Sequence, residues 1–160
     1  MGDEYRVRKF REEDAFAVSE LIARTLVESN LKDYSQQCIE GLIESYSPQG
    51  IINKASSLHF YVVCSNDGII GCGGIGAYFG KEDESCLFSI FVAPIYQGKG
   101  VGKKIVNALE QDEYFLRAKR VEIPSSITAR DFYESLGYSY KEGKKVLDEN
   151  RLYKMEKFRD

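Results

Sequence analysis

The sequence predicts a single α+β domain built around a mixed β-sheet. Its length of 160 residues fits one domain with a substantial hydrophobic core. The spacing of apolar residues changes repeatedly between a helical and a strand period. No repeat, low-complexity tract or linker divides the chain, so the whole of 1–160 is expected to fold as one unit.

The order of the elements follows from this periodicity. Apolar residues at spacings of three and four predict helices, and runs of aromatic and β-branched residues predict strands. In chain order we expect a strand over 5–9, helices over 12–30, 35–47 and 51–55, strands over 58–64, 69–79 and 85–92, a helix over 100–117, a strand over 120–123, a helix over 129–136, and strands over 138–141 and 152–158. Thr128 and Asp131 resemble a capping box before the 129–136 helix, and Gly137 is expected to end it in the left-handed conformation.

Composition excludes several classes of protein. The chain is 43% hydrophobic and 29% charged, as globular proteins are. Its formal charge of −3 argues against a general nucleic-acid binder, which needs a basic face. No apolar run reaches the roughly 18 residues that span a membrane, and the N-terminus is charged rather than secretory in character. We therefore expect a cytoplasmic protein without nucleic-acid or membrane partners.

The four cysteines indicate neither a metal site nor a disulfide. They show no C-x-x-C spacing, and three of them lie in apolar runs; they are Cys38, Cys64, Cys72 and Cys86. We expect reduced thiols that act as small core residues, and no metal.

Two segments contain closely spaced glycines, and only one has the context of a binding loop. The first, 71–76, fits G-x-G-x-x-G, but the strand-like pattern continues through 77–80 and no helix follows. A dinucleotide site needs a strand, a loop and then a helix. We therefore interpret 71–76 as a strand whose small residues allow a helix to pack closely against it.

The second glycine segment, 97–102, has the required context. An apolar strand leads through Pro94 into the loop, and an amphipathic helix follows at once. Glycines at 98, 100 and 102 would let the backbone approach a phosphate, and the N–H groups and dipole of the helix start favour an anion. The loop is no P-loop, because G-x-x-x-x-G-K-[ST] is absent. It adds positive charge through Lys99, Lys103 and Lys104.

These residues resemble a known family. Gln97, Gly100 and Gly102 match motif A of the GNAT superfamily of acetyl-CoA-dependent N-acyltransferases, which reads Gln/Arg-x-x-Gly-x-Gly/Ala. Downstream, 131–138 (DFYESLGY) is similar to the family's motif B. The resemblance covers the element order from 5 to 158. It implies a single-domain GNAT-like fold with a mixed, mostly antiparallel sheet of about six to seven strands, flanked by helices and splayed at the motif-A strand.

The resemblance also implies a site for acetyl-CoA. The family's geometry assigns the Ile90 N–H to the acetyl carbonyl and the Val92 main chain to the pantetheine arm, with Phe91 between them. A backbone donor at that place would stabilise the oxyanion of the intermediate. The pyrophosphate is expected at the loop and helix start: Gln97, Gly98, Lys99, Gly100, Val101, Gly102 and Lys103. Many relatives have an asparagine before the motif-B helix, where this chain has Ser126 at the end of Pro124-Ser125-Ser126, and its hydroxyl would cap the helix or bond the cofactor.

Tyr133 is the expected general acid. The resemblance puts this tyrosine near the thioester sulfur, where its phenol would protonate the departing thiolate. It also lies on the apolar face of its helix, where a core tyrosine would lie. For the general base, Glu84 is the candidate, with Glu122 as a second; both are also compatible with ordinary solvated carboxylates. His59, the only histidine, is expected to be structural.

The implied function is transfer of the acetyl group of acetyl-CoA directly to a primary amine within a ternary complex. The acceptor would be a small molecule or an amine of a protein or peptide, and its side of the site is expected over 26–55. Two alternatives stay open: a non-catalytic acyl-CoA-binding or regulatory module, and a transferase of a longer acyl chain. A homodimer is compatible with each of these.

Overall fold

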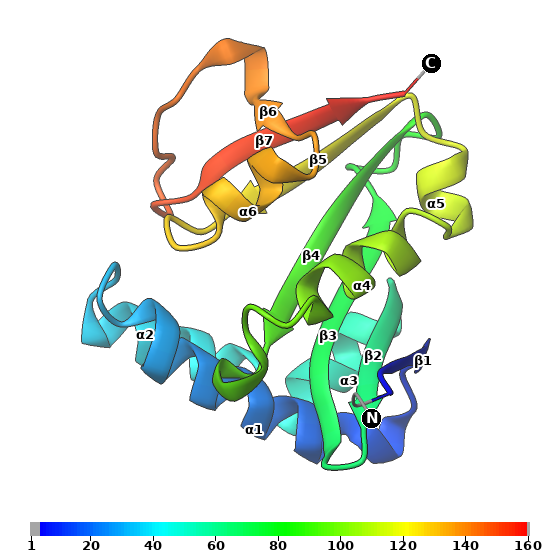
Figure 1. Ribbon diagram of the computed structural model, residues 1–160. Coiled ribbons are helices and arrows are strands. Elements are labelled where there is room, and N and C mark those ends of the chain that lie inside the picture. Colours follow the sequence, from blue (N-terminus) through cyan, green and yellow to red (C-terminus); the bar gives the residue numbers. More distant parts are fainter. Residues whose placement is uncertain (1–3, 160) are drawn as a thin grey trace.

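A seven-stranded mixed sheet forms the centre of the molecule (Figure 1). The computed structural model describes residues 4–159. The strands are β1 (Arg6–Lys9), β2 (His59–Ser65), β3 (Gly68–Ala77), β4 (Glu84–Val92), β5 (Arg120–Ser125), β6 (Ser139–Tyr140) and β7 (Tyr153–Phe158). They lie in the order β1-β2-β3-β4-β5-β7-β6, and every neighbouring pair is antiparallel except β4 and β5. The predicted mixed, mostly antiparallel sheet is confirmed.

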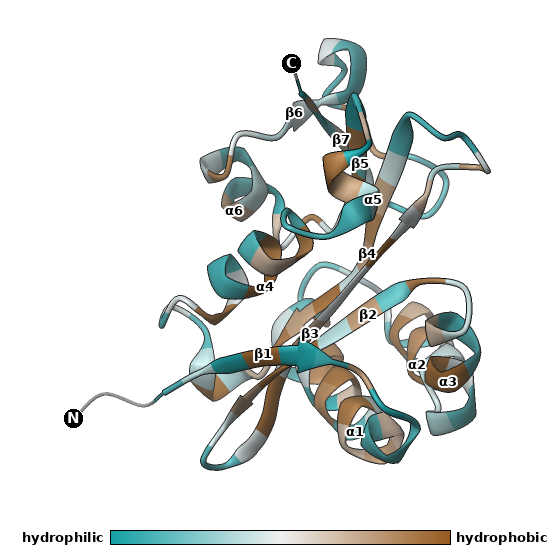
Figure 2. Ribbon diagram, turned by 90° about the vertical axis from the view of Figure 1, so that its right-hand side faces the viewer, coloured by the Kyte–Doolittle hydropathy of each residue, from teal (hydrophilic) through white to brown (hydrophobic). Residues whose placement is uncertain are grey.

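Helices cover both faces of the sheet (Figure 2). The main helices are α1 (Ala15–Thr25), α2 (Gln36–Ser45), α3 (Pro48–Ala55), α4 (Val101–Leu109), α5 (Glu113–Leu116) and α6 (Arg130–Ser135). One hydrophobic cluster joins the sheet to α1, α2 and α3, and a second joins it to α4, α5 and α6. We call these groups the N-terminal helix layer (α1–α3) and the C-terminal helix layer (α4–α6). Within the described residues, none of these helices combines the length and apolar character that crossing a membrane requires.

The sheet splays open between β4 and β5. These strands pair over only three positions, Glu84 with Arg120, Ser85 with Val121, and Cys86 with Glu122. Beyond them β4 continues to Val92 along β3, whereas β5 continues to Ser125 along β7. Figure 1 shows the two strands diverging from this closed end. The splay expected at the motif-A strand is therefore present.

A network of buried charges holds the closed end of the splay. Arg120, whose side chain is 11% exposed, donates to Glu84 on β4 at 2.9 Å and to Glu156 on β7 at 2.8 Å. It also pairs with Glu122 at 2.5 Å, and Lys141 contacts the same carboxylate at 2.9 Å. One guanidinium thus connects three neighbouring strands through charge-assisted hydrogen bonds.

The long helix predicted over 100–117 is divided in two. Asp112 begins α5 by accepting from the Tyr114 N–H, and its carboxylate also accepts from Tyr61 and contacts His59 Nδ1 at 3.0 Å. These partners on β2 turn Asp112 inward and end the first helix near Leu109. Periodicity alone does not reveal the cause of this break, because the partners of Asp112 lie more than fifty residues earlier in the chain.

Two other helices differ from their predicted boundaries at the ends. The helix expected over 51–55 begins earlier, at Pro48, because the Ser47 hydroxyl accepts from the Gly50 N–H at 3.1 Å. The helix expected over 12–30 has a 3₁₀ turn at its start and a π-helical turn, Leu26–Asn30, at its end.

The capping box predicted before α6 does not form. The Ser126 hydroxyl accepts from the Ala129 N–H at 3.1 Å, while Thr128 donates to Asp33 at 2.6 Å. Gly137 does adopt the left-handed conformation, with φ of 97°.

The expectation for the cysteines holds in part. Cys72 and Cys86 are buried, and burial raises the pKa of both thiols to about 12. Cys38 is exposed on α2, so the prediction of a core residue is wrong there.

The glycines of β3 allow α4 to lie directly on the sheet. A Cβ atom at Gly73 would come within 2.7 Å of Ile105 Cγ2 and 3.2 Å of Leu109 Cδ1. At Gly71 it would lie 3.0 Å from Val101 Cγ1. The interpretation of 71–76 as a strand that permits close helix packing is confirmed.

Gly73→Ala should therefore destabilise the fold, because its Cβ would push α4 away from the sheet. We expect the free energy of unfolding to fall by about 1–3 kcal/mol in urea titrations. Gly41→Ala on α2 is the matched control, since nothing lies within 4 Å of its Cβ position. It should raise stability by up to about 1 kcal/mol through helix propensity. Equal stability of the Gly73 variant and wild type would contradict the packing role.

Candidate active site

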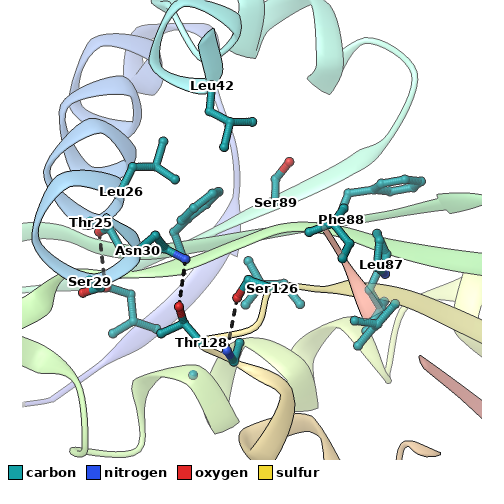
Figure 3. Close-up of a pocket in the computed structure, with 18 of the residues that line it drawn as sticks. Thr25, Leu26, Ser29, Asn30, Leu42, Leu87, Phe88, Ser89, Ser126 and Thr128 are labelled. Atoms are coloured by element: carbon teal, nitrogen blue, oxygen red, sulfur yellow. Dashed lines mark hydrogen bonds between the residues drawn. The ribbon is translucent and has the colours of Figure 1, made fainter. Parts of the chain in front are cut away.

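A cavity of about 1220 Å³ opens where β4 and β5 separate. Its wall combines parts of the chain that are distant in sequence: β4, the end of β5, the glycine loop, α6, the N-terminal helix layer and residues 149–152. Figure 3 shows Leu26, Leu42 and Ser89 on one side of β4, with Ser126 and Thr128 across the opening from them. The cavity thus passes through the gap in the sheet.

The glycine loop lies at one end of this cavity. Gly98 and Gly100 have φ angles of 77° and 84°, a conformation that side chains other than glycine rarely adopt. Gly100 is the N-cap of α4 and supplies no side-chain cap. The first N–H groups of a helix have no intrahelical acceptor, so those at the start of α4 are placed to bind an anion. Lys103 also lines the cavity, which adds positive charge.

Three further predicted loop residues make contacts within the protein. A Cβ at Gly102 would lie 3.0 Å from Phe132 Cζ, so this glycine lets α4 approach α6. The Val101 side chain is buried in the core, which leaves only its main chain for a ligand. The Lys99 ammonium lies 5.4 Å from the centre of the Tyr96 ring.

Gln97 ties the loop to the end of β4. Its Nε2 donates to the Val92 carbonyl at 3.1 Å and to the Ser29 hydroxyl at 3.0 Å. Thr25 donates to the same Val92 carbonyl at 3.3 Å. The Gln97 side chain therefore fixes the strand edge next to the loop.

The open edge of β4 presents main-chain groups to the gap. The Ala93 N–H donates to the Ile70 carbonyl on β3 at 2.8 Å. Because the main-chain groups of successive strand residues alternate in direction, those of Val92 and Ile90 point away from β3, toward the gap. Phe91 points its ring into the N-terminal helix layer, where it meets Tyr46 at 5.5 Å between ring centres.

A β-bulge interrupts β4 beside these residues. Cys72 pairs with Phe91 and Gly74 with Phe88, so β4 contains one residue more than β3 across this interval. Ser89 takes the left-handed conformation, with φ of 56°, and its hydroxyl lies 2.8 Å from the Tyr46 hydroxyl. The side chain of Ser89 points toward the N-terminal helix layer (Figure 3).

Tyr133 reaches the cavity from α6. It is only 6% exposed, and burial raises the pKa of its phenol well above the usual value. The phenol therefore keeps its proton at neutral pH and is available as a hydrogen-bond donor. Its ring packs against Phe132 and Tyr138, which fixes it on the inner side of α6. Ser126, across the gap from β4, also lines the cavity while it caps the 126–129 turn.

The structure does not bring Glu84 to the cavity. It lies at the closed end of the splay, paired with Arg120 and Lys81, and is not among the lining residues. Partial burial alone would raise its pKa, but the hydrogen bonds from Arg120 and Lys81 outweigh it and hold the pKa of Glu84 below its usual range. Glu122 belongs to the same network. Neither carboxylate is positioned beside the proposed reacting atoms.

His59 also lies away from the cavity. Its Nδ1 is 3.0 Å from both oxygens of the buried Asp112, as expected for a structural histidine.

Sequence reasoning missed how the 149–152 segment closes the site. The Tyr34 hydroxyl donates to the Arg151 carbonyl at 2.9 Å and accepts from the Ile127 N–H at 2.9 Å. It thus connects the start of the α2 region with two segments more than ninety residues away. The sequence shows only a polar turn at 142–151, and no local pattern relates it to Tyr34.

An open strand edge beside a glycine loop at a helix N-terminus defines a class of acyl-transferring domains, and the comparison with known families agrees. The model of the acetyltransferase (GNAT) domain family matches residues 56–140, which is more than half of the chain. The chain belongs to this GNAT acetyltransferase family and is an acyltransferase. No curated protein sequence matches it.

Solved structures share the fold along the whole chain. The PaiA N-acetyltransferase of Thermoplasma acidophilum, in complex with coenzyme A, superposes with a TM-score of 0.82 at 18% identity, over 98% of this chain and 99% of that one. A GCN5-related N-acetyltransferase from Rhodopseudomonas palustris gives 0.78 at 19% identity, over 99% and 98%. An aminoglycoside 6'-N-acetyltransferase complexed with coenzyme A gives 0.68 at 14% identity, over 96% of each chain. At such identities the likeness is one of fold.

Glu84→Gln separates a structural role from the predicted role as general base. The pKa of Glu84 is lower folded than unfolded, so its ionisation stabilises the fold above an unfolded pKa of about 4.3, and this contribution is lost as pH falls through the folded pKa. We expect urea titrations to show a loss of about 1 kcal/mol at pH 7 that shrinks below about pH 4. Glu82→Gln, in the same turn but exposed, is the control. A kcat reduced by about a hundredfold with unchanged stability would instead identify Glu84 as the base.

Proposed function

We propose that this protein is an N-acetyltransferase that uses acetyl-CoA and transfers the acetyl group directly to a primary amine. The observation that supports this most strongly is the splay of β4 from β5 next to the glycine loop. The gap offers an extended chain a strand edge, and the loop offers a diphosphate the N-terminus of α4. Pantetheine linked to a pyrophosphate has this shape and chemistry. Two solved structures of the same fold contain coenzyme A.

In this proposal coenzyme A crosses from the glycine loop into the gap. Its pyrophosphate binds the N–H groups that follow Gly98 and Gly100, with Lys103 beside it. The pantetheine arm runs along β4 and pairs with the main chain of Val92. Gln97 supports this arrangement by holding the Val92 carbonyl, and Ser126 lies across the gap.

The acetyl carbonyl then reaches the Ile90 N–H. When the amine nitrogen attacks the thioester carbon, negative charge develops on the carbonyl oxygen, and a fixed N–H donor stabilises that charge. The bulge at Ser89 supports this role because it sets the direction of the following main-chain groups. Collapse of the intermediate breaks the C–S bond, and the thiolate takes the proton of the Tyr133 phenol.

The amine must lose its own proton for the reaction to balance. Of the described residues that line the cavity, Glu149 alone has a carboxylate, and it is exposed in the 144–152 loop. We therefore propose that the acceptor attacks as the neutral amine, that the attacking nitrogen then releases a proton to solvent, and that the Tyr133 phenolate left by thiolate protonation regains a proton from solvent. Glu84 as general base stays a prediction. A cytoplasmic location and a homodimer are likewise predictions.

The glycine loop can be tested by binding alone. Gly100→Glu places a carboxylate where the pyrophosphate is proposed and strains a left-handed position by about 1–2 kcal/mol. We expect calorimetry to show at least a hundredfold loss of affinity for coenzyme A. Gly80→Glu is the matched control, because Gly80 also has a positive φ of 76° and open space around it but lies outside the cavity. Unchanged coenzyme A affinity in the Gly100 variant would remove the loop from the site.

Tyr133→Phe tests the general acid. The ring and its packing are kept, so we expect normal stability and coenzyme A affinity but a kcat lowered by about a hundredfold or more. Release of free thiol from acetyl-CoA with a panel of amines measures this. Tyr138→Phe, which removes a hydroxyl bonded to Glu110 in the same core, should leave kcat largely unchanged.

Two outcomes would favour the alternatives. Tight coenzyme A binding without turnover of any amine, and no effect of Tyr133→Phe, would indicate a non-catalytic acyl-CoA-binding module. Preference for a longer acyl-CoA would indicate a different donor. Initial rates that give intersecting rather than parallel reciprocal plots would support the ternary complex.

A further inference from the structure

The cavity extends beyond the proposed cofactor path to the side of the N-terminal helix layer, whose residues also line it. The glycine loop and Tyr133 belong to the C-terminal helix layer, so the donor occupies that end. What remains lies between the bulge of β4 and helices α1–α3. We call this part the acceptor chamber; its walls are Leu26, Cys38, Leu42, Tyr46, Leu58 and Phe88.

The side chains that line the acceptor chamber are mostly apolar. Leu42 points into it beside Leu26 (Figure 3), while Leu58 and Phe88 are half-buried around it. The hydroxyls nearby already have partners within the protein. Tyr34 bonds to Ile127 and Arg151, and Tyr46 bonds to Ser89. The chamber therefore offers an incoming molecule apolar contact.

The charges around the chamber disfavour a polycation. Among the described lining residues, one carboxylate, Glu149, is present with three cations, Lys54, Lys103 and Arg151. Lys103 is assigned to the donor's pyrophosphate, which leaves Lys54 and Arg151 on the acceptor side. The Lys54 ammonium lies 4.9 Å from the centre of the Tyr46 ring, at the chamber wall. A second ammonium on the acceptor would meet like charge in a partly desolvated space, which is unfavourable.

Two acidic residues of this region are hydrogen-bonded to neutral polar side chains. Asp33 accepts from Thr128 at 2.6 Å, and Glu40 accepts from Gln36 at 3.2 Å. Neither lines the cavity.

We propose that the acceptor is a monoamine whose amino group is attached to an apolar body, and not a polyamine or another polycation. This rests on the proposed function, because it assumes that the amine meets the thioester beside the bulge. The apolar body would lie against Leu42, Leu58 and Phe88, with its amine toward Ile90. Each methylene buried there would add roughly fourfold in affinity.

Matched acceptors test directly whether a second ammonium on the acceptor lowers turnover. Hexylamine and 1,6-diaminohexane share one carbon chain and differ by a second ammonium, so their kcat/KM ratio isolates that charge. We expect hexylamine and 2-phenylethylamine to exceed the diamine and spermidine by about tenfold or more. A peptide with an N-terminal phenylalanine is compared with one that begins with serine. Better turnover of the phenylalanine peptide than of hexylamine would indicate that the acceptor is an apolar peptide terminus and not a small amine.

Leu42→Glu should weaken or abolish the preference. A carboxylate at this position would disfavour the apolar body and attract a second ammonium, lowering the hexylamine-to-diamine ratio by about tenfold. Leu31→Glu is the control, because Leu31 is similarly exposed, at 42% against 36% for Leu42, but does not line the cavity. Both side chains reach solvent, so both variants should fold.

The outcomes separate the two proposals. Equal or better turnover of the diamine or spermidine by wild type would overturn the inference while the N-acetyltransferase function stands. An unchanged ratio in the Leu42 variant would also overturn it. Coenzyme A binding without turnover of any amine would overturn both.

Discussion

The site depends on the parallel pairing of β4 and β5 being strong but short. Arg120 joins β4, β5 and β7 through three carboxylates at one end, which fixes where the strands meet. After Cys86 each strand follows a different neighbour, β3 or β7, so the right-handed twist of the two half-sheets separates them. A strand edge is normally a liability that proteins cover. Here it lies inside a cavity, where its main-chain groups can bind a ligand.

Two backbone features then define the edges of that gap. The bulge at Ser89 and the left-handed residues Gly98 and Gly100 lie at opposite ends of a short stretch of chain. Gln97 joins them by holding the Val92 carbonyl, so loop and strand edge keep a fixed relation. The polar groups proposed to contact the donor are therefore mostly main-chain groups. Side-chain chemistry is concentrated at Tyr133, which burial keeps protonated.

The two helix layers divide the site between donor and acceptor. The C-terminal helix layer provides the loop, the N-terminus of α4 and Tyr133. The N-terminal helix layer provides an apolar chamber, and Tyr34, just before α2, bonds to Arg151 of the 144–152 loop across the opening. The acceptor wall and the donor side therefore come largely from different helix layers. This arrangement explains why the glycine loop indicates the donor but not the acceptor.

The sequence by itself determined the features that local conformation encodes. The elements, the glycine loop, the left-handed Gly137 and the role of Gly71 and Gly73 in a strand all follow from periodicity and from what glycine allows. Only the tertiary structure decided what each side chain faces. Arg120 holds Glu84 from 36 residues away, Asp112 ends a helix because of residues on β2, and Cys38 is exposed on α2. Contacts between distant residues leave no local pattern, so the splay was expected only through the family resemblance, and the apolar acceptor chamber required the packed structure.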